Sequence, residues 1–130
     1  MTTNFSVRGI HHVQLAMPQG GEQDAVDFYT GLLGFTQIPK PAHLQARGGC
    51  WFQLEQIQFH LGVEEPFTPA RKAHPALTVT DLPALQERLE QAEVEIVWDT
   101  QLDGHRRFYT HDCFGNRLEL IEAVPTGEGD

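Results

Sequence analysis

The alternation of apolar and polar residues divides the chain into two similar halves. The first half predicts a helix over 22–33 and strands over 10–17, 35–38, 50–54 and 57–63. The second half predicts a helix that begins after Asp81 and strands over 74–80, 94–98, 106–111 and 116–123. Both halves therefore have the order β-α-β-β-β, which indicates a duplicated unit rather than a solenoid repeat.

Turn-forming and capping residues mark the ends of these elements. Pro18 follows the first strand, and Gly34 stands where a helix C-terminal cap is expected. Asp81 is a suitable N-cap for the second helix, whose apolar face carries Leu82, Leu85, Leu89 and Ala92. The segment over 112–116 is expected to form a tight turn between the last two strands.

The segment over 64–72 contains two prolines and no periodicity, which predicts a linker. We therefore expect one structural domain of the α+β class, built from two tandem βαβββ modules. The first module is expected over 1–63 and the second over 73–124, followed by a frayed tail over 125–130.

Strand parity, the alternation of side chains between the two faces of a strand, identifies four polar residues as candidate site residues. In the strand over 10–17 the apolar residues share one face, and His12 lies on the other. Each helix must cover the more apolar face of its own sheet, so His12, His60, His74 and Glu119 all face the uncovered, concave side. Three imidazoles and one carboxylate suit a divalent ion such as Zn, Ni, Mn or Fe(II), which predicts one metal per site. The alternative is a polar groove in which these residues only hydrogen-bond to one another.

The remaining histidines do not fit this pattern. Parity places His11 on the helix-covered face, where we expect a structural role. Three others, His43, His105 and His111, fall in or beside loops and are expected at the surface.

Composition and charge narrow the possible partners. The formal net charge is −9, from 9 Lys and Arg against 18 Asp and Glu, so phosphate backbones would repel the chain and nucleic acid is a poor partner. No apolar run is long enough for a membrane helix, and the first residues lack the layout of a signal peptide. We therefore expect a cytoplasmic protein whose two cysteines, Cys50 and Cys113, are packed thiols.

Four motifs resemble the vicinal oxygen chelate superfamily, the group of glyoxalases, bleomycin resistance proteins and extradiol dioxygenases. They are Ile10-His-His-Val-Gln-Leu15, Phe28-Tyr-Thr-Gly-Leu-Leu-Gly-Phe35, Gln58-Phe-His-Leu-Gly62 and Arg107-Phe-Tyr-Thr-His-Asp-Cys-Phe-Gly-Asn-Arg-Leu-Glu119. The resemblance implies a U-shaped, mostly antiparallel eight-stranded sheet with a metal in its cleft. Cys113 stands where this hairpin usually has proline, and we expect it to loosen the turn slightly without changing the site.

The resemblance also implies roles for the four polar residues. His12, His74 and Glu119 match the two-histidine, one-carboxylate set of the dioxygenase and fosfomycin branches. His60 takes the place that is Glu in glyoxalase I and Gln in methylmalonyl-CoA epimerase, another member of the superfamily. A glyoxalase-type proton transfer uses a metal-bound carboxylate as base, and here only Glu119 could serve, which argues against glyoxalase I itself. Whether His60 is a ligand, a base or structural stays open.

The resulting hypothesis is a metal-dependent lyase, isomerase or dioxygenase that acts on a small molecule with vicinal oxygens. Parity places Trp51, Gln53, Arg107 and Tyr109 along the cleft, with Arg107 available for an anionic substrate group. The alternative is a non-catalytic protein that sequesters a small molecule or drug. Such members generally lack a full ligand set, so four candidate ligands favour an enzyme.

We also expect a homodimer, because the first strand of each half presents an edge that needs cover. The sequence leaves open the substrate, the reaction and the metal. It also leaves open whether one site is built within a chain or across the dimer.

Overall fold

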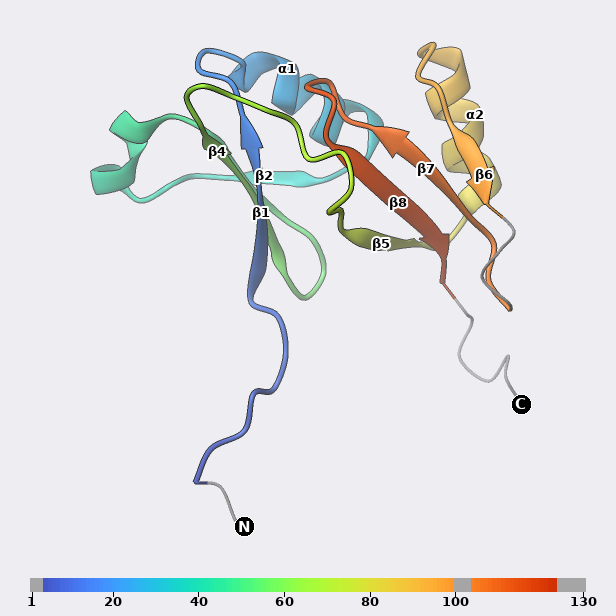
Figure 1. Ribbon diagram of the computed structural model, residues 1–130, viewed down its shortest axis with the longest axis horizontal. Helices are drawn as coiled ribbons and strands as arrows, with labels where there is room; N and C mark the ends of the chain where they lie inside the picture. The colour runs from blue at the N-terminus through green and yellow to red at the C-terminus, as the bar shows by residue number, and fades with distance from the viewer. Residues whose placement is uncertain (1–3, 100–103, 124–130) are drawn as a thin grey trace.

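The computed structural model describes residues 4–99 and 104–123, and within them the strands form two four-stranded sheets (Figure 1). The strands of the first sheet are β1 (His12–Met17), β2 (Thr36–Ile38), β3 (Cys50–Gln53) and β4 (Gln58–Val63). Those of the second sheet are β5 (Ala76–Val79), β6 (Val97–Asp99), β7 (Arg107–His111) and β8 (Arg117–Glu122). The predicted α+β fold of two βαβββ modules is confirmed, with the strands divided between two sheets rather than joined in one.

Both sheets have the same topology. Their strand orders are β1-β4-β3-β2 and β5-β8-β7-β6. The first and last strands of each module pair in parallel, and the other neighbouring strands pair antiparallel. Because β1 and β5 each stand at one end of a sheet, each presents a backbone edge.

The first helix begins where it was predicted but changes its winding. Residues Glu22–Val26 form the α-helix α1, which continues as the π-helical segment η1 (Asp27–Leu32). The wider turns of η1 accompany the burial of two consecutive rings, those of Phe28 and Tyr29. Gly34 follows with a φ of +78°, as expected for a residue that ends a helix.

The second helix, α2 (Leu82–Gln91), is capped as predicted. The Asp81 carboxylate accepts a hydrogen bond from the backbone N–H of Ala84 at 3.1 Å. Leu82 and Leu89 are buried in the core, whereas Ala92, one residue beyond the helix, is exposed. A short 3₁₀ helix, η2 (Ala42–Arg47), was not predicted.

The apolar residues of the strands follow the predicted parity. Phe59 and Leu61 of β4 and Leu118 and Leu120 of β8 are buried in one hydrophobic core with residues of α1, η1 and α2. The alternating residues of the same strands, which include His60 and Glu119, therefore point to the other side of each sheet. This arrangement positions the candidate donors.

Some predictions concern residues just outside a strand or outside the part of the chain that the structure describes. β5 begins at Ala76, so His74 lies just before the strand. The whole predicted tail falls outside the described residues, as do residues 100–103. In the part of the chain that the structure describes, no helix has the length and apolar character needed to cross a bilayer.

Candidate functional site

His74 and Glu119 form a pair at the second sheet. Nε2 of His74 lies 2.9 Å from Oε1 of Glu119, and Nδ1 of His74 lies 2.8 Å from the carbonyl oxygen of Lys72. Since a carbonyl oxygen and a carboxylate oxygen can only accept, both ring nitrogens donate in this structure, and a metal bound at Nε2 would take the place of the proton there. A backbone carbonyl that holds one imidazole nitrogen in this way is common around metal-ligating histidines.

The other oxygen of Glu119 is held by Arg107. Nη1 of Arg107 donates to Oε2 at 2.9 Å, and Nη2 donates to Oδ2 of Asp99 at the same distance. Burial alone would raise the pKa of Glu119, which is 5% exposed, but the hydrogen bonds from Arg107 and His74 outweigh burial and lower it. The carboxylate is therefore ionised at neutral pH, with one oxygen beside His74 and the other fixed by a guanidinium.

An aromatic ring lies next to this pair. The Tyr109 ring meets the His74 ring edge to face, with centroids 5.4 Å apart. The guanidinium of Arg117 lies over the same Tyr109 ring at 4.0 Å, and that of Arg107 at 5.4 Å. Of the predicted lining residues, Arg107 and Tyr109 are thus gathered around Glu119.

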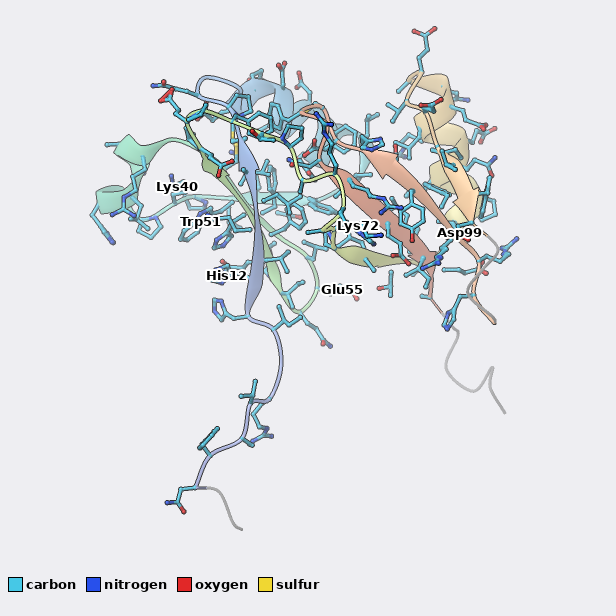
Figure 2. The ribbon with its side chains drawn as sticks, viewed as in Figure 1. His12, Lys40, Trp51, Glu55, Lys72 and Asp99 are labelled. Atoms are coloured by element: carbon cyan, nitrogen blue, oxygen red, sulfur yellow. The ribbon has the colours of Figure 1, made fainter. Side chains whose placement is uncertain are left out.

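The first sheet carries a stack of three rings. Trp51 and His60 stack at 4.0 Å with an interplanar angle of 2°, and His60 and His12 stack at 4.3 Å with an angle of 18°. Figure 2 shows His12 and Trp51 on the first sheet, apart from Asp99 of the second. The imidazole of His60, only 4% exposed, is therefore enclosed between two rings.

The hydrogen bonding and charge of His60 follow from this enclosure. Nε2 of His60 lies 2.8 Å from the amide oxygen of Gln58, which assigns the proton to Nε2 and leaves Nδ1 as the bare nitrogen. Burial is the main cause that lowers the pKa of His60 to about 4, with additional effects of His12, His11 and Lys40. His60 is therefore a neutral imidazole at physiological pH.

The prediction for His11 is wrong. His11 is exposed, its ring meets the His12 ring edge to face at 5.2 Å, and the two Nδ1 atoms lie 3.0 Å apart. β1 begins only at His12, so the alternation of strand faces does not extend to the residue before it. His11 thus lies against one of the candidate donors rather than under a helix.

Gln53 has a local role in the hairpin. Its side-chain amide donates to the carbonyl oxygens of Leu54 at 2.7 Å and Ile57 at 3.1 Å. These bonds close the turn between β3 and β4.

The donors of the two sheets occupy equivalent positions of the repeat. His60 is opposite Gln14 on β1, and Glu119 is opposite Ala76 on β5, so each lies two register positions beyond the histidine of its module. Within the described residues, however, no three His, Cys, Asp or Glu side chains come together in a group able to hold a metal. The four predicted donors form two pairs, one on each sheet.

Two neighbours of the donors, Gln58 and Arg117, were not predicted as site residues. Strand parity carried the signal, because each lies two positions before a donor on the same strand and faces the same side. What parity could not show is that Gln58 bonds to His60 and that Arg117 lies over Tyr109.

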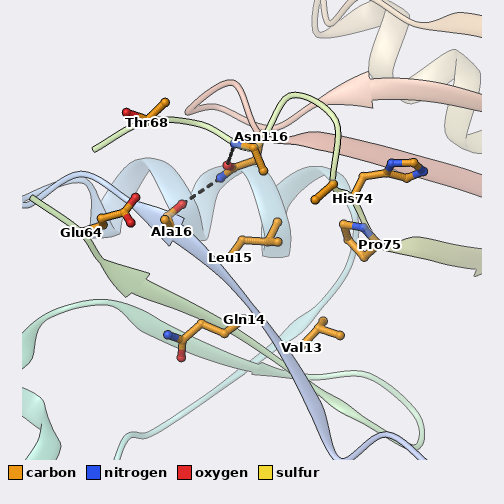
Figure 3. A pocket seen from close by; sticks show the side chains of 11 residues that line it. Val13, Gln14, Leu15, Ala16, Glu64, Thr68, His74, Pro75 and Asn116 are labelled. Carbon is orange, nitrogen blue, oxygen red and sulfur yellow. Dashed lines mark hydrogen bonds between the residues drawn. The ribbon is translucent and has the colours of Figure 1, made fainter. Parts of the chain in front are cut away.

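A groove of about 490 Å³ runs between β1 and the linker, away from most of the donors (Figure 3). It is lined by Val13, Gln14, Leu15, Ala16, Glu64, Thr68, Ala70, Ala73, His74, Pro75 and Asn116. His74 is the one candidate donor among these residues. The groove therefore follows β1 and reaches His74 but none of the other three candidate donors.

Comparisons with known proteins agree with this architecture. The family model described as "Glyoxalase/Bleomycin resistance protein/Dioxygenase superfamily" matches residues 9–120. A protein of Bacillus anthracis assigned to the glyoxalase family is 41% identical, with a TM-score of 0.89, over 92% of this chain and 98% of that one. No curated protein gave a significant match.

More distant solved structures share the fold. The fosfomycin resistance protein FosX of Listeria monocytogenes has a TM-score of 0.73 at 14% identity, over 95% of this chain and 99% of its own. A lactoylglutathione lyase of Agrobacterium tumefaciens has a TM-score of 0.69 at 16% identity, over 88% of this chain and 93% of its own. At these identities the similarity concerns the architecture, not the reaction.

Proposed function

The chain belongs to the Glyoxalase/Bleomycin resistance protein/Dioxygenase superfamily, and on that premise we propose that it is a divalent-metal-dependent enzyme acting on a small molecule with vicinal oxygens. We further propose that each site is shared between two copies of the chain. The observation that supports sharing is the division of the donors into one pair on each sheet. The side chains of each pair contact one another, but two donors are too few to hold a metal ion.

The number of donors argues for a second copy. Protein sites for zinc and related ions use three or more protein ligands, whereas each sheet offers two. Within the described residues the two pairs do not meet. A second copy could bring its His12 and His60 against His74 and Glu119, and the open edges of β1 and β5 would gain cover in the same contact.

The chemistry of the donors fits a metal. His74 presents Nε2 with its other nitrogen fixed, and Glu119 presents Oε1 with its other oxygen held by Arg107. His12 would be the third ligand, and His60 could add Nδ1 as the fourth. When bound, Zn, Ni, Mn or Fe(II) would act as a Lewis acid towards oxygen atoms of the substrate.

The other residues would bind the substrate and handle protons. If His60 is not a ligand, its bare Nδ1 can accept a proton, but the pKa of about 4 makes it a weak base. Glu119 is the one carboxylate of the donor set, and its ion pair with Arg107 makes it a weaker base. Trp51 and Tyr109 offer aromatic surfaces beside the donors, which suits a small organic substrate.

These features favour a lyase, isomerase or dioxygenase over the reaction of glyoxalase I. In the latter, the metal-bound base is a carboxylate, and here His60 stands at the position equivalent to Glu119. The alternative function is binding of a small molecule without turnover. The ring stack of Trp51, His60 and His12 supports it, because stacked rings also suit a planar ligand.

Mixed dimers provide the test. His12→Ala and His74→Ala chains would be unfolded together, refolded together, and the mixed dimer isolated with two different affinity tags. If sites are shared, one site of the mixed dimer lacks both histidines and the other keeps both, so we expect one zinc ion per mixed dimer and none in either parent. His43→Ala, which changes an exposed histidine far along the chain from the donors, is the control and should keep full occupancy. No zinc in the mixed dimer, with full occupancy in the wild type, would reject the shared site.

A further inference from the structure

We propose that Arg117 recognises an oxyanion group of the substrate, so that the ligand is a small organic anion with a carboxylate, phosphate or phosphonate. The proposal rests on the proposed function for the location of the substrate. Anion binding can nevertheless be measured separately from metal binding. It assigns to Arg117 the anion contact that the sequence suggested for Arg107.

Arg107 is already engaged by two carboxylates. Its Nη1 and Nη2 donate to Glu119 and Asp99, each at 2.9 Å, and the side chain is 15% exposed. Its buried Nε makes no hydrogen bond among the described residues. An incoming anion would therefore have to break two ion pairs to use this guanidinium, so Arg107 acts as a positioning residue for Glu119.

Arg117 is placed differently. It lies two residues before Glu119 on β8 and faces the same side of the sheet. It is partly exposed, and in the described part of the chain the salt bridges involve His74, Arg106 and Arg107 but not Arg117. Its guanidinium therefore keeps an uncompensated positive charge beside the donor pair.

The Tyr109 ring orients this charge. The guanidinium carbon of Arg117 lies 4.0 Å from the ring centroid, which is a cation–π contact that leaves the planar N–H donors in place for an oxyanion. The same ring also contacts the His74 ring, with centroids 5.4 Å apart, so an anion bound by Arg117 would lie near the His74–Glu119 pair. A formal charge of −9 repels anions from the chain as a whole, which makes a dedicated cation necessary for such a substrate.

The matched variants are Arg117→Gln and Arg106→Gln. Both remove one positive charge, but Arg106 lies just before β7, is exposed and pairs with Glu122 at 2.6 Å. Methylphosphonate is the probe, titrated into metal-free protein and followed by the backbone amide signals of Arg117 and Tyr109. We expect saturable binding to the wild type and to Arg106→Gln, and at least about tenfold weaker binding to Arg117→Gln, since charged bidentate hydrogen bonds are worth 1.4 kcal/mol or more.

The outcomes separate this proposal from the metal site. Equal affinity of Arg117→Gln and wild type would overturn it, as would no saturable binding to the wild type or an equal loss in Arg106→Gln. Thermal unfolding and zinc content of each variant are measured in parallel, and Arg117→Gln should keep both within error of the wild type. Methylphosphonate binding that depends on Arg117, in a protein that binds no zinc, would reject the proposed metal function and support the anion site.

Discussion

The hydroxyl of Tyr29 donates a 2.6 Å hydrogen bond to Oδ2 of Asp112, although the two residues lie in different modules. Asp112 also accepts from the backbone N–H of Phe114 and from that of Asn116, each at 2.9 Å. Asn116 in turn donates to the carbonyl oxygen of Ala16 at the end of β1, at 2.8 Å. This buried network attaches the β7–β8 turn to the first module and so fixes the two sheets relative to each other.

Replacement of Tyr29 by Phe should therefore destabilise the protein. The ring would still fill the core, but Asp112 would lose a buried hydrogen bond, and we expect a loss of about 1–3 kcal/mol in the free energy of unfolding. Urea denaturation followed by circular dichroism gives this value. Tyr109→Phe is the control and should change it by less than about 0.5 kcal/mol, since Tyr109 is partly exposed. Equal stability of Tyr29→Phe and wild type would show that the network does not stabilise the fold.

The same residue predicts a loss of stability in alkali. Burial, and then the charge and hydrogen bond of Asp112, raise the pKa of Tyr29 well above its ordinary value near 10. The unfolded chain thus loses this proton at lower pH than the folded chain does. The stabilisation is complete below about pH 10 and decreases as the pH rises further. Denaturation curves at about pH 9 and about pH 11 should diverge more for the wild type than for Tyr29→Phe.

The metal site gives a third prediction. His74→Ala and Glu119→Ala should each abolish tight zinc binding, because each removes one of three core ligands. Elemental analysis after dialysis measures the occupancy, and His43→Ala should retain it. Unchanged zinc content in both His74→Ala and Glu119→Ala would remove these residues from the site.

Arg107 provides a graded test of the same site. Arg107→Gln keeps both metal-binding side chains but frees Oε2 of Glu119, so zinc affinity should fall about 10–100-fold without being lost. Competition with a chelator measures the affinity, and Arg106→Gln is the matched control on the neighbouring residue. An affinity of Arg107→Gln equal to that of the wild type would show that Arg107 does not position the carboxylate.

Much of the fold could be predicted because its signals are local. Alternating apolar residues marked the strands, Asp81 marked the start of α2, and Gly34 marked the end of the first helical segment. Parity also placed His60 and Glu119 on the correct faces. The widened turns of η1 were not predicted, since no local residue preference distinguishes them from an α-helix.

Less of the candidate site than of the fold could be predicted from the sequence. Parity gives the face of a side chain but not its partner, so the ring stack of Trp51 with His60 and the ion pair of Arg107 with Glu119 were out of reach. Parity also failed for His11, which lies just outside its strand. The separation of the donors into two pairs depends on how the sheets pack, to which long-range contacts such as that of Tyr29 with Asp112 contribute.

The role of His60 can be decided by comparison with His12. His60 is equivalent to Glu119 in the repeat and keeps a bare Nδ1, so we expect it to be a ligand. On this expectation, zinc occupancy at a fixed buffer should be lost in His12→Ala and markedly reduced in His60→Ala. If His60 is instead a base or a packed ring between Trp51 and His12, His60→Ala should keep its zinc.

Two further variants separate an effect on zinc ligation from a loss of packing. Trp51→Phe keeps an aromatic ring against His60 and should retain zinc, whereas Gln58→Leu removes the acceptor that holds the Nε2 proton and should weaken zinc binding if Nδ1 is the ligand atom. Equal thermal unfolding of the four variants would show that occupancy reports on ligation and not on folding. Full occupancy in His60→Ala together with none in His12→Ala would leave a site of His12, His74 and Glu119. His60 would then act on the substrate or on the orientation of its neighbours.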